Sequence, residues 1–144
     1  MGSACKSVAT VCGEQFFRMD NGMNKGELIV THPVGYELDE KYIGKTKVTH
    51  HQDEALKNAD FIYVKNWSSY TLYGKVITDD PMWMLNKQKL RMTNNASVMH
   101  CLPVRRNVEL SDEILDSPNS VVTQQAGNRV WAAQAVLSHI LRSI

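Results

Sequence analysis

The sequence predicts an α/β fold in which a doubly wound, mostly parallel sheet carries helices on both faces. Short apolar runs alternate along the chain with segments of helical composition, as is typical of parallel sheets whose strands are joined by helices. The chain has 144 residues, of which 43% are hydrophobic and 22% charged, and these are ordinary values for one globular domain. We therefore expect a single compact unit with a real core.

The predicted strands are short apolar segments bounded by breakers. Residues 27–31 form the clearest one, because His32-Pro33 and then Gly35 end the apolar run. The other predicted strands are residues 47–50, 60–65, 96–101 and 120–123. In a parallel sheet, ligands bind beyond the carboxyl ends of the strands. This rule selects His32-Pro33, Lys65-Asn66-Trp67 and His100-Cys101-Leu102-Pro103 as candidate positions.

Helices are predicted between the strands and at the end of the chain. Asp79 and Asp80 offer capping side chains ahead of Pro81, which predicts a helix from Pro81 to about Met92. Shorter helices are predicted over residues 38–43, 52–59 and 111–117. From Gln125 onward apolar residues recur every three or four positions, which predicts an amphipathic terminal helix. These residues are Ala126, Val130, Ala133, Leu137, Ile140 and Ile144.

Charge and cysteine content exclude several classes of function. With 16 basic and 15 acidic residues the net charge is +1, so nothing calls for a nucleic-acid partner or an anionic membrane. No apolar run approaches the ~20 residues of a membrane span, and no signal peptide is recognisable, so we expect a cytoplasmic protein.

Cys5, Cys12 and Cys101 lack C-x-x-C spacing and are expected to be reduced. His50-His51 have no spaced partner, so no metal site is expected.

Residues 100–107, His-Cys-Leu-Pro-Val-Arg-Arg-Asn, combine a thiol, an imidazole and two guanidinium groups where a predicted strand ends. Arginine offers planar, paired donors to a carboxylate or a phosphate, so the segment indicates an anionic ligand. The plainer alternative is a strand end flanked by surface arginines. A cysteine-protease dyad is disfavoured, because His100 and Cys101 are neighbours and point to opposite faces of a strand.

Three segments together carry a family resemblance: ADFIYVKNW (59–67), MHCLPVRRN (99–107) and Ala126-Gly127-Asn128-Arg129. In this order and approximate spacing they resemble the transcarbamylases that act on N-acylated ornithine, the N-succinylornithine and N-acetylornithine carbamoyltransferases. The resemblance covers the family's second, amino-acid-binding domain. We therefore expect residues 25–144 to form this ornithine-binding-type α/β domain. Residues 1–24 match loosely, with a helix expected from Val8 to Met19, and the family's first strand of the domain is not recognisable.

The resemblance implies a reaction and a set of site residues. A carbamoyl group would pass from carbamoyl phosphate to the δ-amine of an N-acylated ornithine, as in arginine biosynthesis, without a metal or an organic cofactor. Cys101, Leu102 and Arg129 would be the catalytic residues and would also bind carbamoyl phosphate. Lys65 and Arg105 would bind the carboxylate of the acylornithine, with Cys101 and Leu102 beside it.

Lys65 distinguishes between branches of the family. Ordinary ornithine transcarbamylases have an aspartate at this strand end, and a later S-M-G motif helps to hold the free α-amine. Acylation removes the α-ammonium of ornithine but keeps its carboxylate, so a cation such as Lys65 is the expected electrostatic partner of that carboxylate. The plainer alternative is that Lys65 is a lysine that only keeps a strand end in contact with solvent and binds no ligand.

The phosphate-binding motifs of the family's other domain, an S-x-R-T-like loop and H-P-x-Q, are absent from this sequence. We therefore expect the chain to be incomplete as an enzyme. The alternative function is a non-catalytic binding or assembly module, or a remnant, that keeps the acylornithine half-site. Family members are trimers, and we expect either self-association or a missing N-terminal domain here.

Overall fold

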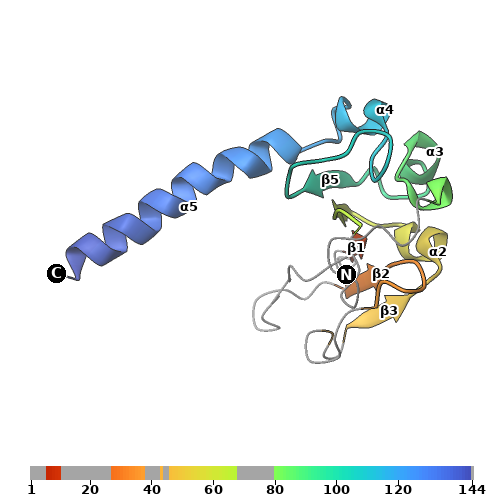
Figure 1. Ribbon diagram of the computed structural model, residues 1–144, viewed down its shortest axis with the longest axis horizontal. Coiled ribbons are helices and arrows are strands. Elements are labelled where there is room, and N and C mark those ends of the chain that lie inside the picture. The colour runs from red at the N-terminus through yellow and green to blue at the C-terminus, as the bar shows by residue number, and fades with distance from the viewer. Residues whose placement is uncertain (1–5, 11–26, 38–42, 44–45, 68–79, 144) are drawn as a thin grey trace, which may run out of the picture.

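The computed structural model describes residues 6–10, 27–37, 43, 46–67 and 80–143 (Figure 1). These residues form one five-stranded sheet with the order β3-β2-β1-β4-β5. Every neighbouring pair of these strands is parallel, which confirms the predicted fold class. The strands are β1 (Lys6–Thr10), β2 (Glu27–Thr31), β3 (Lys47–Thr49), β4 (Phe61–Val64) and β5 (Ser97–His100).

The central strand, β1, lies in a segment for which the sequence predicted a helix. It pairs with β2 on one side, from Lys6 with Glu27 onward, and with β4 on the other. The prediction of a helix from Val8 is therefore wrong for residues 8–10, and the strand missing from the sequence analysis is present. The rest of residues 1–24 lies outside the described residues. The sequence Lys-Ser-Val-Ala-Thr has one large apolar side chain, so it lacks the apolar run that marks β2 and β4.

The strand predicted over residues 120–123 is also wrong. Val98 of β5 donates its N–H to the carbonyl of Asn119 at 2.8 Å and accepts from the N–H of Val121 at 2.9 Å. After these two hydrogen bonds the chain enters a long helix at Val122. The β-branched residues here therefore make a brief bridge beside the sheet and then the first turn of a helix.

The helical segments are short except for the last. They are α2 (Gln52–Leu56), the 3-10 helix η1 (Pro81–Trp83), α3 (Lys87–Leu90), α4 (Asp112–Leu115) and α5 (Val122–Arg142). The prediction of a short helix over residues 38–43 lies, except for Ile43, outside the described residues.

The helix predicted from Pro81 to Met92 is interrupted in its middle. The N–H of Leu85 donates to the carbonyl of Glu109 at 2.9 Å, and the carbonyl of Leu85 accepts from Ser111 at 3.0 Å. An extended backbone is needed for this pairing with another segment, so a continuous helix cannot form. Asn86 then restarts the helix, because its Oδ1 accepts the N–H of Lys89 at 3.0 Å.

The main core lies on one face of the sheet, beneath α2, α3 and α4. The strand register places Ile29, Ile62 and Val98 on the same face, and all three are buried. The helices contribute Leu56, Ile114 and their neighbours to this cluster. The first turns of α5 approach the opposite face, beside Tyr63 of β4. Helices therefore contact both faces of the sheet.

Beyond its first turns, α5 projects away from the sheet (Figure 1). Its large apolar side chains remain exposed; they are Val130, Trp131, Val136, Leu137, Ile140 and Leu141, with exposed fractions of 49–72%. We call these six residues the α5 stripe. No helix in the described part of the chain has the length and apolar character needed to cross a membrane.

Candidate functional site

The carboxyl ends of β4 and β5 bring two predicted site residues together. Val64 and His100 are paired in register, so the residues that follow them leave the sheet side by side. Lys65 Nζ donates a hydrogen bond to Cys101 Sγ at 3.2 Å. The strand order reverses between β1 and β4, and ligands of doubly wound sheets bind at such a switch point. Lys65 is 8% exposed, so most of this residue is buried at this edge.

The loop after β5 folds back toward its own strand. Leu102 has φ of 54°, in the left-handed region that residues with a Cβ seldom adopt, and the Leu102–Pro103 peptide is cis. The N–H of Leu102 donates to Nδ1 of His100 at 2.9 Å. Asn66, which follows Lys65, donates from Nδ2 to the carbonyl of Pro103 at 3.1 Å. The loops after β4 and β5 are thus held together at two points.

His100 is the buried support of this loop. Burial lowers the pKa of His100 to about 4, with further lowering by the charges of Lys65 and Arg105, so the ring is neutral at pH 7. Since Nδ1 accepts the N–H of Leu102, the single ring proton lies on Nε2. Within the described residues Nε2 has no hydrogen-bond partner. The sequence predicted no role for His100, and in the structure it holds the loop after β5 in place.

The start of α5 closes the site from the other side. Arg129 Nη2 donates to the backbone carbonyl of Cys101 at 3.0 Å, and Gln125 Oε1 accepts the N–H of His100 at 3.0 Å. A cleft of about 400 Å³ lies between this helix and the ends of β4 and β5. Its lining residues are Tyr63, His100, Cys101, Gln125, Ala126, Asn128, Arg129 and Ala132. The predicted residues Cys101 and Arg129 therefore face the same cleft.

Tyr63 and Gln125 are cleft residues that the sequence analysis missed. Tyr63 lies two positions before Lys65, so the period-2 alternation of a strand already indicated its face. Burial raises the pKa of Tyr63, hydrogen bonding to Gln125 opposes that rise, and the neighbouring Cys101 side chain adds to it. Gln125 lies one turn before Arg129 on α5, a spacing that places both on one face of a helix.

Arg105 is held by a buried carboxylate. Its Nε donates to Glu109 Oε1 at 2.6 Å, and its backbone N–H donates to Oε2 of the same residue at 3.2 Å. A terminal guanidinium nitrogen, Nη2, also pairs with Glu109. The Glu109 side chain is fully buried whereas that of Arg105 is 41% exposed, so this pair fixes a guanidinium with one side open to solvent.

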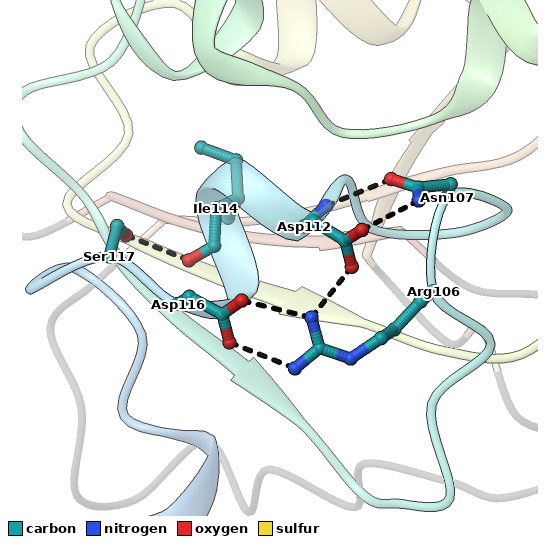
Figure 2. A network of polar contacts seen from close by, with 6 residues as sticks. All are labelled: Arg106, Asn107, Asp112, Ile114, Asp116 and Ser117. Atoms are coloured by element: carbon teal, nitrogen blue, oxygen red, sulfur yellow. Dashed lines mark hydrogen bonds and ion pairs between the residues drawn. The ribbon is translucent and has the colours of Figure 1, made fainter.

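Arg106 belongs to a separate network on the surface (Figure 2). Its two terminal nitrogens pair with both carboxylate oxygens of Asp116, at 2.8 and 3.0 Å, and Nη1 also donates to Asp112 at 2.6 Å. Asn107 exchanges two hydrogen bonds with Asp112, at 2.8 and 2.9 Å. The hydrogen bonds from Arg106 lower the pKa of both carboxyl groups. Of the two adjacent arginines, Arg106 therefore anchors α4.

The third predicted position, His32-Pro33 after β2, has its own polar contacts. Nδ1 of His32 lies 2.8 Å from the carbonyl of Pro33, and Nδ1 of His50 lies 2.9 Å from the carbonyl of His32. The two imidazole rings pack edge to face with centroids 4.8 Å apart. Within the segments that the structure describes, no group of three His, Cys, Asp or Glu side chains is arranged to hold a metal ion.

The sequence of this chain matches a known protein family and several of its characterised members. Residues 18–140 match the family described as "Aspartate/ornithine carbamoyltransferase, Asp/Orn binding domain". An N-succinylornithine carbamoyltransferase of Bacteroides fragilis (strain 638R) is 44% identical, over 82% of this chain and 38% of the relative. An N-acetylornithine carbamoyltransferase of Xylella fastidiosa (strain 9a5c) is 35% identical, over 72% of this chain and 36% of the relative. The chain thus spans well under half the length of these relatives.

Solved structures agree with the sequence matches. The ornithine carbamoyltransferase from Pyrococcus furiosus superposes with a TM-score of 0.74 at 29% identity, over 94% of this chain and 49% of that one. An acetylornithine transcarbamylase complexed with acetylcitrulline gives a TM-score of 0.73 at 26% identity, over 94% of this chain and 48% of that one. Because the family match spans most of its residues, the chain belongs to the aspartate/ornithine carbamoyltransferases, as their Asp/Orn binding domain.

Proposed function

We propose that this chain provides the N-acylornithine half of a carbamoyltransferase site. The full reaction would transfer a carbamoyl group from carbamoyl phosphate to the δ-amine of the acylornithine. Relatives named for N-succinylornithine and N-acetylornithine support this substrate class. In this proposal residues 25–144, together with β1, form the ornithine-binding-type domain.

The observation that carries the proposal is the position of Lys65. This residue is 8% exposed at the edge of the sheet, and the hydrogen-bond partner of its ammonium is the sulfur of Cys101, a weak acceptor. In the part of the chain that the structure describes, Lys65 has no ion pair with a carboxylate. A buried cation is costly without an anionic partner. The carboxylate of an acylated ornithine, which carries no α-ammonium, supplies that partner.

In this proposal Arg129, Leu102 and Arg105 each contact a different part of the two substrates. Arg129 would donate to carbamoyl phosphate beside Cys101, while the carbonyl of Leu102 would accept from the attacking amine. Donors near the developing oxyanion and the leaving phosphate lower the barrier of acyl transfer. Arg105 keeps its second terminal nitrogen, Nη1, for the substrate carboxylate, since Glu109 takes Nε and Nη2.

A non-catalytic assembly module is the second candidate, and the α5 stripe favours it. Six large apolar side chains at 49–72% exposure are unusual on a surface without a partner. We propose that in this chain the stripe binds a second copy of itself. A second copy is supported as the partner because its own stripe offers an apolar surface of the same character.

Turnover and binding assays separate the two candidates. The purified 144-residue chain is titrated calorimetrically with N-succinylornithine and N-acetylornithine, and assayed for citrulline-type product with carbamoyl phosphate. We expect binding of an acylornithine with little or no turnover, because catalysis needs both reactants held in attack geometry. Robust turnover contradicts the half-site assignment, and absence of binding by a folded chain favours the assembly module.

A further inference from the structure

The side chains of Lys65 and Cys101 are in direct contact, and an amine beside a thiol can react as well as bind a ligand. An amine nitrogen and a sulfur lie 3.2 Å apart in a direct hydrogen bond. The register of β4 and β5 fixes both backbones, and burial of Lys65 restricts the path of its side chain. The two atoms are thus already in contact, and bond formation between them requires only a small approach.

Cys101 also has the surroundings of an oxidisable thiol. Such thiols are partly exposed and lie near positive charge. Cys101 is partly buried and lines the cleft of about 400 Å³, which is far larger than a peroxide molecule. Its sulfur accepts from the Lys65 ammonium, and its carbonyl accepts from the Arg129 guanidinium. A small oxidant therefore has access to a sulfur with an amine beside it.

We propose that hydrogen peroxide cross-links Lys65 and Cys101 as a reversible sulfenamide. First the Cys101 sulfur attacks a peroxide oxygen, the O–O bond breaks, and sulfenic acid and water form, so that sulfur loses two electrons and peroxide gains them. Then the neutral Lys65 amine, its ammonium proton given to solvent, attacks the sulfenic sulfur. An S–N bond forms, the S–O bond breaks, and the departing hydroxide takes the remaining amine proton as water.

The cross-link changes two groups at this edge of the sheet at once. The product has lost the positive charge of Lys65 and the thiol of Cys101. If the site binds acylornithine, which rests on the proposed function, oxidation abolishes that binding and a thiol reductant restores it. The site is then sensitive to the oxidation state of its surroundings.

The decisive experiment is mass spectrometry of the oxidised chain, and it requires no substrate. Cys5 and Cys12 are replaced by serine, so that Cys101 is the single thiol. The folded chain is treated with dilute hydrogen peroxide, and the intact mass and the protease digest are compared with those of untreated protein. We expect a species lighter by two hydrogens, a peptide that joins Lys65 to Cys101, and full reversal by dithiothreitol.

Matched variants test the geometry. Lys65→Arg keeps a cation but lacks the nucleophilic amine, and is expected to yield sulfenic and sulfinic acids at Cys101 without a cross-link. Lys87→Arg, an exposed position on α3, is expected to cross-link like the parent. Circular dichroism confirms that each variant is folded, and the chain unfolded in urea is expected not to form the Lys65 link.

The outcomes separate this inference from the proposed function. Sulfinic acid without a cross-link in the folded parent, or a link from Cys101 to another amine, overturns the inference. A Lys65–Cys101 link in a chain that binds no acylornithine in either redox state supports the inference and contradicts the proposed function.

Discussion

Glu109 holds Arg105 at both the side chain and the backbone. One carboxylate oxygen accepts from Nε at 2.6 Å, and the other accepts from the backbone N–H at 3.2 Å. Glu109 also accepts nothing from solvent, since it is 1% exposed, while its carbonyl binds the N–H of Leu85. This single residue therefore links the loop after β5, the proposed substrate arginine and the interruption between η1 and α3.

Glu109→Ala is expected to destabilise the fold and to loosen Arg105. Hydrogen bonds to charged groups contribute about 1.5–3 kcal/mol, and the partial exposure of Arg105 places the expected loss toward the lower end. Urea unfolding measures the loss. Asp112→Asn is the matched control, because it weakens the exposed Arg106 pair, which solvent screens and which is therefore expected to contribute less to stability. Equal losses in the two variants contradict the anchoring role of Glu109.

His100 is expected to make the fold sensitive to mild acid. Its pKa in the folded chain is about 4, below the ordinary value of 6.5. Between these two pH values the unfolded chain therefore binds a proton at His100 that the folded chain does not bind. Stability from this source is complete above pH 6.5 and falls as the pH drops toward 4, by up to about 1.4 kcal/mol per pH unit. Urea unfolding between pH 7 and pH 4.5 measures the slope.

The control for this prediction is His100→Asn. The amide oxygen of asparagine occupies nearly the position of Nδ1 and still accepts the N–H of Leu102, but it does not titrate. Burial also lowers the pKa of His32, and that contribution has the same sign and remains in both proteins. The difference in slope between parent and variant therefore isolates His100. Identical slopes contradict the prediction.

The sequence predicted the strands that carry apolar runs, β2, β4 and β5, and therefore the edge where Lys65 and Cys101 meet. It missed β1 because Lys-Ser-Val-Ala-Thr has no apolar run that marks a strand, although this strand lies at the centre of the sheet order. It also predicted an unbroken helix across Leu85, whose backbone pairs with a segment more than 20 residues later. Long-range pairing of this kind leaves no local signal in the sequence.

Within the site, features that depend on local sequence were likewise predicted, and features that depend on long-range contacts were not. The positions of Lys65 and Cys101 just beyond two strand ends are a local feature that the structure reproduces, whereas the roles expected for them rest on the family resemblance. The contact of Gln125 with His100 depends on how α5 crosses β5, and the pairing of Arg105 with Glu109 depends on a loop that folds back. Neither follows from the period of a strand or a helix.

The α5 stripe is expected to drive self-association of the chain. Burial of the stripe against a second copy removes side chains such as Leu137 and Leu141 from water, at roughly 25 cal/mol per Å² of apolar surface. Sedimentation equilibrium over a range of concentrations is expected to show a mass above 16.3 kDa that rises with concentration. Leu137→Lys is expected to shift the chain to monomer, whereas His139→Lys, on the opposite side of the helix, leaves association unchanged. A monomer at all concentrations contradicts the prediction.

Lys65→Asp tests which substrate binds beyond the carboxyl ends of β4 and β5. The ammonium of Lys65 is expected to attract the carboxylate of an acylornithine, which has no α-ammonium of its own. Loss of a charge-assisted hydrogen bond costs about 1.5–3 kcal/mol, and the new carboxylate adds repulsion, so affinity for N-acylornithine should fall at least tenfold. Free ornithine should lose less, because its ammonium can approach the new aspartate.

The measurement is calorimetric titration of N-succinylornithine, N-acetylornithine and free ornithine against the parent chain, Lys65→Asp and Lys65→Met. The methionine variant removes the charge without adding repulsion, so its acylornithine affinity should lie between those of the other two proteins. Circular dichroism establishes that both variants remain folded, because the side chain of Lys65 is buried in the parent. If the folded aspartate variant keeps the parent's ratio of acylornithine to ornithine affinity, then Lys65 does not bind the substrate carboxylate, and its lack of an ion pair among the described residues has another cause.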